Sequence, residues 1–405
     1  MTRVSVPEHI PQNLVVNVDF YKLALSEEDI FEAWKRLSVL CRNVPGADAG
    51  LVYTPENGGH WIAATGEALE ALFPDTENLS NSSIAIPAHE GLLIVPGEAD
   101  GDMHKFTRRA VMQWFTPIKV RAMREPIGQI VEELIAELYQ QGECEFMSEM
   151  AFNLPMHLFL RMMALPIEDG PMLLNLVNSV IREGEKEKKI AAMSAIFKYL
   201  EDVIDQRLVN PGDDLISHLC KSEYDGGPMP RNLVHSMCVN LLLGGLDTVA
   251  SMLGFIMKYL AEDKPLREKL ASNPELIEGA LQEFTRRFAV TSLGRVVAKD
   301  FTYKGVELRA GERVLLATPL HGMDEQKFGC PMKVDIDRKI PLVMSFGRGS
   351  HQCVGSFLAR IELAEALAGW LRHIPDFHIA DGKEPRVSCG AVNAMEYLPL
   401  KWSVK

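Results

Sequence analysis

A glycine-rich loop that holds one cysteine and leads directly into a helix constrains the fold more than any other stretch of the sequence. The loop reads F-G-R-G-S-H-Q-C-V-G over residues 346–355, and the pattern of residues 356–371 predicts a helix. Glycines in such a loop let the backbone turn tightly and come close to a flat ligand. The dipole and the N–H groups at the start of the helix favour a thiolate at Cys353. A buried structural cysteine in a glycine-rich turn is the alternative reading.

The same ten residues resemble the haem-binding loop of the cytochromes P-450, the haem-thiolate monooxygenases, in the pattern F-x-x-G-x-H-x-C-x-G. The resemblance covers essentially the whole chain. It implies a mainly α fold with a minor β part, in which haem b lies between a long distal helix and the helix after the cysteine. It also implies a single domain over residues 1–405. Cys353 would be the axial ligand of the haem iron, with Phe346, Gly347 and Gly349 beside the haem.

Composition limits the class of protein. The 405 residues are 47% hydrophobic, which is ample for a large core, and the net charge of −13 argues against nucleic acid or an anionic membrane as a partner. Seven cysteines without a C-x-x-C pair indicate a reducing compartment. The N-terminal residues do not resemble a signal peptide, and no uninterrupted apolar run is long enough to span a bilayer. We expect a cytoplasmic monomer.

Hydrophobic periodicity predicts a mostly helical chain with a few strands. We expect a helix over 27–40 with Ser26 as its N-cap, a hairpin from 51–54 and 59–65, and a short helix over 66–72. Further helices are expected over 103–114, 117–141, 149–163, 168–182, 187–209, 213–221, 231–262, 265–271 and 274–288. Strands are expected within 295–317 and near 377–379, 387–389 and 397–402, with an irregular stretch over 318–345.

The long loop over 74–103 has an apolar middle. A loop of this length in a compact protein is usually functional. The resemblance places it where the family has its substrate-covering loop, and simple packing on the core is an equal alternative.

The long apolar helix contains the sequence L-L-L-G-G-L-D-T over residues 241–248. Two glycines leave room on one face of a helix and permit a local distortion. By resemblance, Gly244 and Gly245 give space for dioxygen, Thr248 hydrogen-bonds the oxygen being activated, and Asp247 relays protons from solvent. A threonine that merely bonds back to a helix carbonyl is the alternative.

Two further groups of charged residues match family motifs. Glu283 and Arg286 lie three apart on a predicted helix, an ordinary surface pair in isolation. The resemblance pairs them with an arginine from the following irregular stretch, here Arg338, in a structural role needed for haem incorporation. Haem propionates require cations when partly buried. The resemblance assigns them to His104, Arg108, Arg295 and His351.

Within the family, the chain most resembles the bacterial camphor hydroxylases, with differences that indicate another substrate. No tyrosine occurs between Ile84 and Met103, and Leu293 replaces an aspartate. These changes predict a roomier, more apolar pocket, suited to a terpenoid or norisoprenoid ketone. Asn240 lies one helical turn before Gly244 and should face the same side; it either bonds a substrate carbonyl or is satisfied by backbone. By resemblance, the pocket residues are Ala85, Asn240, Leu243, Gly244, Thr291, Leu293, Ala391 and Val392.

A monooxygenase of this type takes two electrons from outside. The resemblance implies an acidic iron–sulfur ferredoxin with a separate NAD(P)H-dependent reductase. Lys105, Arg108, Arg109 and Arg348 would form a basic patch that steers this partner, or simply a solvated basic face. A peroxide-driven enzyme and a non-catalytic haem carrier or sensor remain alternatives to dioxygen-dependent hydroxylation. The intact pair of Asp247 and Thr248 favours oxygen activation.

Overall fold

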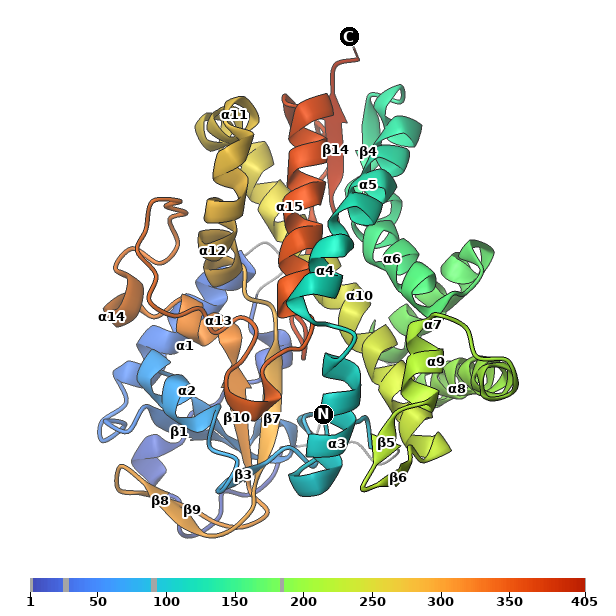
Figure 1. The fold of residues 1–405 in the computed structure, drawn as a ribbon. Coiled ribbons are helices and arrows are strands. Elements are labelled where there is room, and N and C mark those ends of the chain that lie inside the picture. Colours follow the sequence, from blue (N-terminus) through green and yellow to red (C-terminus); the bar gives the residue numbers. More distant parts are fainter. Residues whose placement is uncertain (1–2, 25–28, 89–92, 183–185, 405) are drawn as a thin grey trace. The chain divides into compact units, whose positions relative to one another are not determined.

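The computed structural model describes residues 3–24, 29–88, 93–182 and 186–404. Contacts divide the chain into two compact units. The first comprises Met1–Gly91, Glu275–Cys353 and Pro385–Glu396, and the second comprises Leu92–Pro274, Val354–Glu384 and Tyr397–Lys405. The predicted fold class is confirmed, since helices predominate and short strands form small sheets (Figure 1).

A five-stranded sheet forms the centre of the first unit. In spatial order it contains β1 (Leu51–Thr54), β2 (His60–Ala63), β10 (Arg313–Ala317), β7 (Ser292–Val297) and β3 (Leu79–Ser80). Strands β1 and β2 form the predicted antiparallel hairpin, β10 runs parallel to β2, and β7 runs antiparallel to β10. Every residue of β1 and β2 is buried, which explains the run of β-branched and aromatic residues in both strands.

Helices and two small hairpins complete the first unit. The helices are α1 (Ile30–Arg42), α2 (Gly66–Leu72), α12 (Ile277–Arg287), α13 (Thr318–Gly322) and α14 (Glu325–Phe328). The two-stranded sheets are β8 (Phe301–Tyr303) with β9 (Val306–Leu308), and β12 (Arg386–Ser388) with β13 (Ala394–Tyr397).

Two predictions for this unit need comment. The predicted N-cap Ser26 lies outside the described residues, and the described α1 begins after Asp29, whose carboxylate accepts the Phe31 N–H at 2.8 Å. The prediction that 318–345 is irregular throughout is wrong. Pro319 occupies the first turn of α13, where its missing N–H costs no helix hydrogen bond, and Asp324 caps α14.

The second unit is mainly helical. Its helices are α3 (Gly101–Met112), α4 (Pro117–Ala122), α5 (Arg124–Tyr139), α6 (Asn153–Met163), α7 (Gly170–Arg182), α8 (Lys186–Val209), α9 (Leu215–Cys220), α10 (Arg231–Glu262), α11 (Lys264–Ser272) and α15 (Ser356–His373). Its strands are β4 (Glu143–Glu145), β5 (Glu223–Tyr224), β6 (Gly227–Pro228), β11 (Phe377–Ile379) and β14 (Pro399–Trp402). The bounds of α10 agree with the prediction, whereas the single helix expected over 117–141 is divided at Met123.

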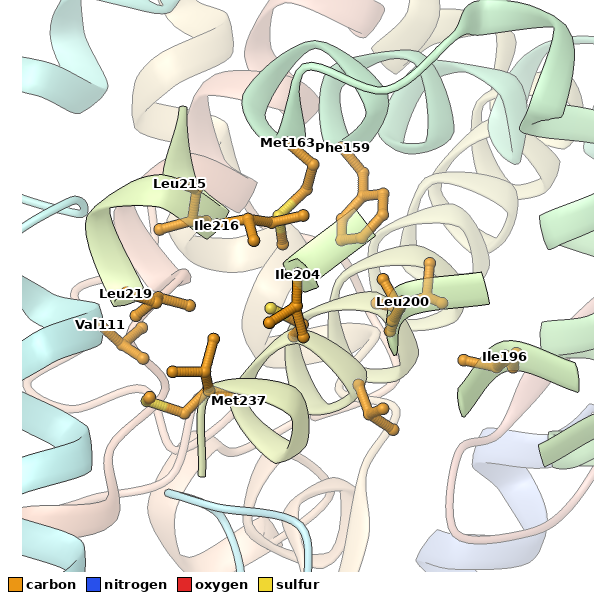
Figure 2. Close-up of a cluster of buried hydrophobic side chains, with 14 of the residues drawn as sticks. Val111, Phe159, Met163, Ile196, Leu200, Ile204, Leu215, Ile216, Leu219 and Met237 are labelled. Atoms are coloured by element: carbon orange, nitrogen blue, oxygen red, sulfur yellow. The ribbon is translucent and has the colours of Figure 1, made fainter. Parts of the chain in front are cut away.

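A cluster of buried hydrophobic side chains joins α6, α8, α9 and α10. Figure 2 shows Phe159 and Met163 from α6 facing Ile204 and the α9 residues Leu215 and Ile216. Within the described part of the chain, α10 alone has the length and mean hydropathy of a membrane span, and Asp247 interrupts its apolar run. Since 67% of its most apolar window is buried inside the protein, the composition of α10 reflects its place in this core.

Candidate functional site

The cysteine loop is held in shape by backbone hydrogen bonds and by two glycines in left-handed conformations. The Cys353 N–H donates to the Phe346 carbonyl oxygen at 2.9 Å. Gly347 and Gly349 have φ of +66° and +82°, values that side-chain-bearing residues rarely adopt. A Cβ at Gly349 would also lie 2.8 Å from the Pro74 Cα, so the loop packs closely on the turn after α2. Both glycines are therefore required by the geometry.

Cys353 differs from most of the other cysteines in its environment. Its side chain is exposed at the end of the loop, and α15 begins three residues further along the chain. Burial raises the pKa of the Cys41 thiol to about 12 and also raises the pKa of Cys144 and Cys238. Those three thiols stay protonated and inert. Cys330 is also exposed, but it lies in the irregular stretch after α14, without a helix directly after it.

An open strip runs along α10 in the second unit. The residues before and after it are buried, yet Gly244 and Gly245 are exposed, and Thr248 is half-buried. A Cβ added to either glycine would meet no atom within 4 Å. Because Asn240, Gly244 and Thr248 are spaced by four residues, they lie on one helix face. The middle of a largely buried helix therefore presents an uncovered surface at these two glycines.

An acid and a hydroxyl lie at the end of this strip. The Thr248 Oγ1 donates to the Gly244 carbonyl oxygen at 3.0 Å, the local bond that the alternative reading anticipated. Asp247 is only 2% exposed. The hydroxyl still has its acceptor lone pairs, and it borders the open strip.

Glu283 and Arg286 form a buried ion pair with the predicted third member, Arg338. The Arg286 Nε and Nη2 lie 2.7 and 2.8 Å from the two Glu283 carboxylate oxygens, and both side chains are nearly inaccessible. The Arg338 Nε lies 3.2 Å from Glu283 Oε1. Arg286 also donates to the carbonyl oxygens of Gly322 and Pro331, at 2.6 and 2.9 Å. This network fixes the segment between α13 and the cysteine loop to α12.

The four predicted propionate ligands fall in two groups, one in each unit. His104 is buried on α3, one turn before Arg108, and burial together with the Arg108 charge lowers the pKa of His104. In the first unit, Arg295 is 3% exposed and donates to the Gly294 carbonyl oxygen at 2.7 Å, with its guanidinium over the Phe73 ring. His351 is half-buried in the cysteine loop.

The predicted pocket residues also fall in two groups. In the first unit, the Ser292 N–H donates to the Ala391 carbonyl oxygen at 2.8 Å, and Thr291 is bridged to Val392, with Leu293 next along β7. The Gly294 N–H donates to the Ile84 carbonyl oxygen at 2.7 Å, which brings Ala85 to the same strand. In the second unit, Asn240, Leu243 and Gly244 lie within one turn of α10. Each group is incompletely buried.

The predicted partner residues lie on exposed surface, with one exception. Lys105 and Arg109 are exposed one turn apart on α3, and Arg348 is exposed in the cysteine loop. Arg108 is half-buried on the side of α3 that carries His104.

Comparison with known proteins decides the family. The family model described as cytochrome P450 matches residues 156–388 of this chain. The chain belongs to the cytochrome P450 family.

Solved structures and a curated relative agree with this membership. The P450 is similar to the crystal structure of CYP101J2, with 33% identity, a TM-score of 0.90 and coverage of 99% of this chain and 100% of that one. The crystal structure of cytochrome P450 CYP101C1 gives 34% identity, a TM-score of 0.90, and coverage of 98% and 100%. The steroid C26-monooxygenase of Mycolicibacterium smegmatis is 30% identical over 75% of this chain and 78% of its own length. This P450 is a monooxygenase that resembles the CYP101 proteins.

The residues of this P450 fit the family cofactor, haem b. The cysteine loop presents an exposed thiol, and its glycines add no side chains beside that thiol. On α10, the glycine pair leaves an uncovered surface. A buried arginine and a buried histidine are present for two carboxylates. Cys353 would hold the iron, with Arg295, His104, Arg108 and His351 as candidates for the propionates. When bound, haem b supplies the redox centre at which dioxygen is reduced and one of its oxygen atoms is transferred to substrate.

Four residues of α10 would leave room for the small molecule at this site and supply hydrogen bonds and protons to it. Gly244 and Gly245 leave this part of α10 without side chains, as the predicted role in giving space to dioxygen requires. The Thr248 hydroxyl is available as a hydrogen-bond acceptor and, after rotation, as a donor. Asp247, the preceding residue, is the predicted relay of protons from solvent.

Sequence reasoning missed two features that shape the site. Phe73 and Pro74, after α2, support the cysteine loop. Ser236 on α10 binds the backbone of the loop before α3, at Leu93 and Val95. Ser236 is one of two serines in this apolar helix, and its sequence position gives no signal of the backbone groups that it binds.

Proposed function

We propose that this P450 hydroxylates a small hydrophobic substrate, a terpenoid or norisoprenoid ketone, with dioxygen and electrons from a ferredoxin. The observation that carries the proposal is the open strip on α10. This surface consists of Gly244, Gly245 and the neighbouring Leu243, with one amide, Asn240. The Asn240 side chain has no hydrogen-bond partner among the described residues. Such a surface suits an apolar skeleton with one carbonyl acceptor.

The other pocket candidates support an apolar substrate. Ala85, Leu293, Ala391 and Val392 carry no charge, and the hydroxyl of Thr291 is already engaged with Thr318 at 3.2 Å. Burying a charged head group among such side chains would be costly. A compact ketone fits this surface better than a fatty acid.

We assign the chemical roles as the sequence predicts them. Cys353 ligates the iron, Thr248 and Asp247 manage protons, and Glu283, Arg286 and Arg338 hold the segment before the cysteine loop. Residues 1–405 act as one monooxygenase domain, a proposal supported by the full-length match to CYP101J2. We also propose a cytoplasmic monomer, as the sequence predicts. The burial of α10 in the protein core supports a place outside the membrane for that helix.

Electrons would come from an acidic iron–sulfur ferredoxin and a separate NAD(P)H-dependent reductase. The exposed Lys105, Arg109 and Arg348 give basic groups on a protein of net charge −13, which favours an acidic partner. Arg108 is less accessible than these three residues, and we assign it to a haem propionate and not to the partner surface.

The substrate proposal is tested by optical titration of the ferric holoenzyme. Camphor and β-ionone should displace the sixth ligand and shift the Soret band, whereas lauric acid should not. Asn240→Leu should weaken ketone binding by about tenfold through loss of one hydrogen bond. A shift with lauric acid and none with either ketone would contradict the proposal.

The alternative functions are separated by turnover. Ketone-dependent consumption of NADH in the presence of ferredoxin and reductase, with a hydroxylated product, supports the monooxygenase. Product formed with hydrogen peroxide but not with the electron-transfer partners would indicate the peroxide-driven enzyme. A haem carrier or sensor would show no ketone-dependent electron consumption.

A further inference from the structure

We infer that Ser236 is a positioning residue that clamps residues 93–98 to α10 and so sets one wall of the substrate pocket. These six residues, called the strap, end shortly before α3. They belong to the long loop over 74–103, which the resemblance places over the substrate, and the inference rests on the proposed function. The strap and α10 lie in the same compact unit.

The Ser236 hydroxyl makes both hydrogen bonds that hold the strap on α10. The Ser236 Oγ donates to the Leu93 carbonyl oxygen at 2.7 Å and accepts the Val95 N–H at 2.9 Å. Ser236 is 3% exposed and Val95 is fully buried. Because water cannot easily replace these bonds, their loss leaves a backbone donor and a backbone acceptor unpaired in the protein interior.

Two hydrogen bonds within the strap close it into a turn. The Glu98 N–H donates to the Ile94 carbonyl oxygen at 2.8 Å, and the Ile94 N–H donates to Glu98 Oε2 at 3.2 Å. Val95 belongs to the hydrophobic cluster that contains Met237, the neighbour of Ser236 on α10 (Figure 2 shows Met237). Hydrogen bonds thus define the turn of the strap, while Ser236 and Val95 fix its place on α10.

The position of the clamp relates the strap to the open strip. Ser236 lies one turn of α10 before Asn240, and Gly244 lies one turn after it, so each neighbouring pair shares a side of the helix. A Cβ on Gly97 would lie 3.3 Å from the Asn240 Oδ1, so the strap backbone passes beside the Asn240 amide. The strap therefore covers α10 up to Asn240 and ends where the glycines are uncovered. Release of the clamp would move the wall next to Asn240.

The test uses four ferric holoenzymes: wild type, Ser236→Ala, Ser236→Thr and Ser251→Ala. Ser236→Thr retains the hydroxyl. Ser251 is a matched control because it is a fully buried serine on the same helix, and its hydroxyl has no partner among the described residues. Two readouts are compared, hydrogen exchange of the strap amides and the association rate of 4-phenylimidazole. This probe needs only access to the haem pocket, and not the proposed substrate.

Ser236→Ala should speed exchange at Val95 and its neighbours by about tenfold, while the amides of α10 around Leu253 keep their protection. It should also raise the association rate of 4-phenylimidazole, and Ser236→Thr should restore both quantities toward wild type. Ser251→Ala should change neither. Unchanged strap exchange in Ser236→Ala would overturn the clamp. Faster exchange with unchanged probe association would overturn its role in the pocket. Failure of the ketones to bind, with both readouts as expected, would reject the proposed substrate and leave the clamp standing.

Discussion

Arg338 and Glu283, 55 residues apart in the chain, form an ion pair in which the Arg338 Nε lies 3.2 Å from Glu283 Oε1. Glu283 is 1% exposed and already carries the shorter contacts of Arg286. A single buried carboxylate thus balances the buried Arg286 guanidinium and the partly exposed Arg338 guanidinium. This arrangement ties α12 to the segment that leads into the cysteine loop.

The first prediction concerns removal of that carboxylate. Glu283→Gln leaves two arginine charges without their counter-ion and should lower the free energy of unfolding by about 3–5 kcal/mol. Because the segment before Cys353 is released, haem content per polypeptide should fall sharply. Arg372→Ala is the control, since its pair with Glu132 is solvent-exposed and should cost less than about 1 kcal/mol. Equal haem content in the two variants would argue against the structural role of Glu283.

The second prediction separates the two residues assigned to proton handling. Thr248→Ala should retain electron consumption but divert it, so that product per NADH falls by about tenfold or more and hydrogen peroxide accumulates. Thr248→Ser keeps the hydroxyl and should recover much of the coupling. Asp247→Asn should instead slow overall turnover, because the supply of protons falls. Product yields in the three variants that match wild type would remove both residues from the mechanism.

The third prediction concerns a buried acid on α15. Burial raises the pKa of Glu362 to about 8, so this side chain is neutral in the folded protein at pH 7. The unfolded chain binds fewer protons between the unfolded pKa and about 8, and stability must therefore fall as pH rises through that window. The loss should be on the order of 2–3 kcal/mol between pH 5 and pH 7.

Glu362→Gln removes this titration and should flatten the dependence of unfolding free energy on pH. The measurement is denaturant unfolding of the ferric holoenzyme at pH 5, 6 and 7. Glu365→Gln on the same helix is the control, because Glu365 is partly exposed and pairs with Arg124 at 2.7 Å. Parallel stability curves for wild type and Glu362→Gln would contradict the raised pKa.

The fourth prediction addresses the electron donor. Arg109→Glu reverses an exposed charge and should slow reduction by an acidic ferredoxin, with a weaker dependence of the rate on salt. Arg309→Glu, an exposed position on the loop after β9, serves as the control for net charge. Stopped-flow reduction of both variants is the measurement. Equal rates would place the docking surface elsewhere.

The sequence alone predicted those parts of the fold that local patterns determine. The bounds of α10 and α2 were predicted well, because apolar periodicity, Pro230 and the Thr65 cap mark them. Short elements were missed. Helices α13 and α14 depend on tertiary packing, since the carbonyl oxygen of Gly322 is held by Arg286. Strands of two or three residues, such as β3 and β4, have too few positions to show alternation.

The site divides in a similar way. Cys353, Thr248 and Glu283 lie in motifs whose spacing is set by one loop or one helix, and these can be read from sequence. Arg338 was selected by resemblance, and its ion pair with Glu283 is present. Ser236 could not be found, because its partners Leu93 and Val95 bind through their backbone, which leaves no residue pattern.

The most direct test of the account is the absorption spectrum of the reduced holoenzyme with carbon monoxide. Ligation by the Cys353 thiolate predicts a strongly red-shifted Soret band, which Cys353→His should abolish while the helical fold, followed by circular dichroism, is retained. A wild-type band typical of imidazole ligation, or folded protein that binds no haem, would contradict the assignment of Cys353 and the site built on it.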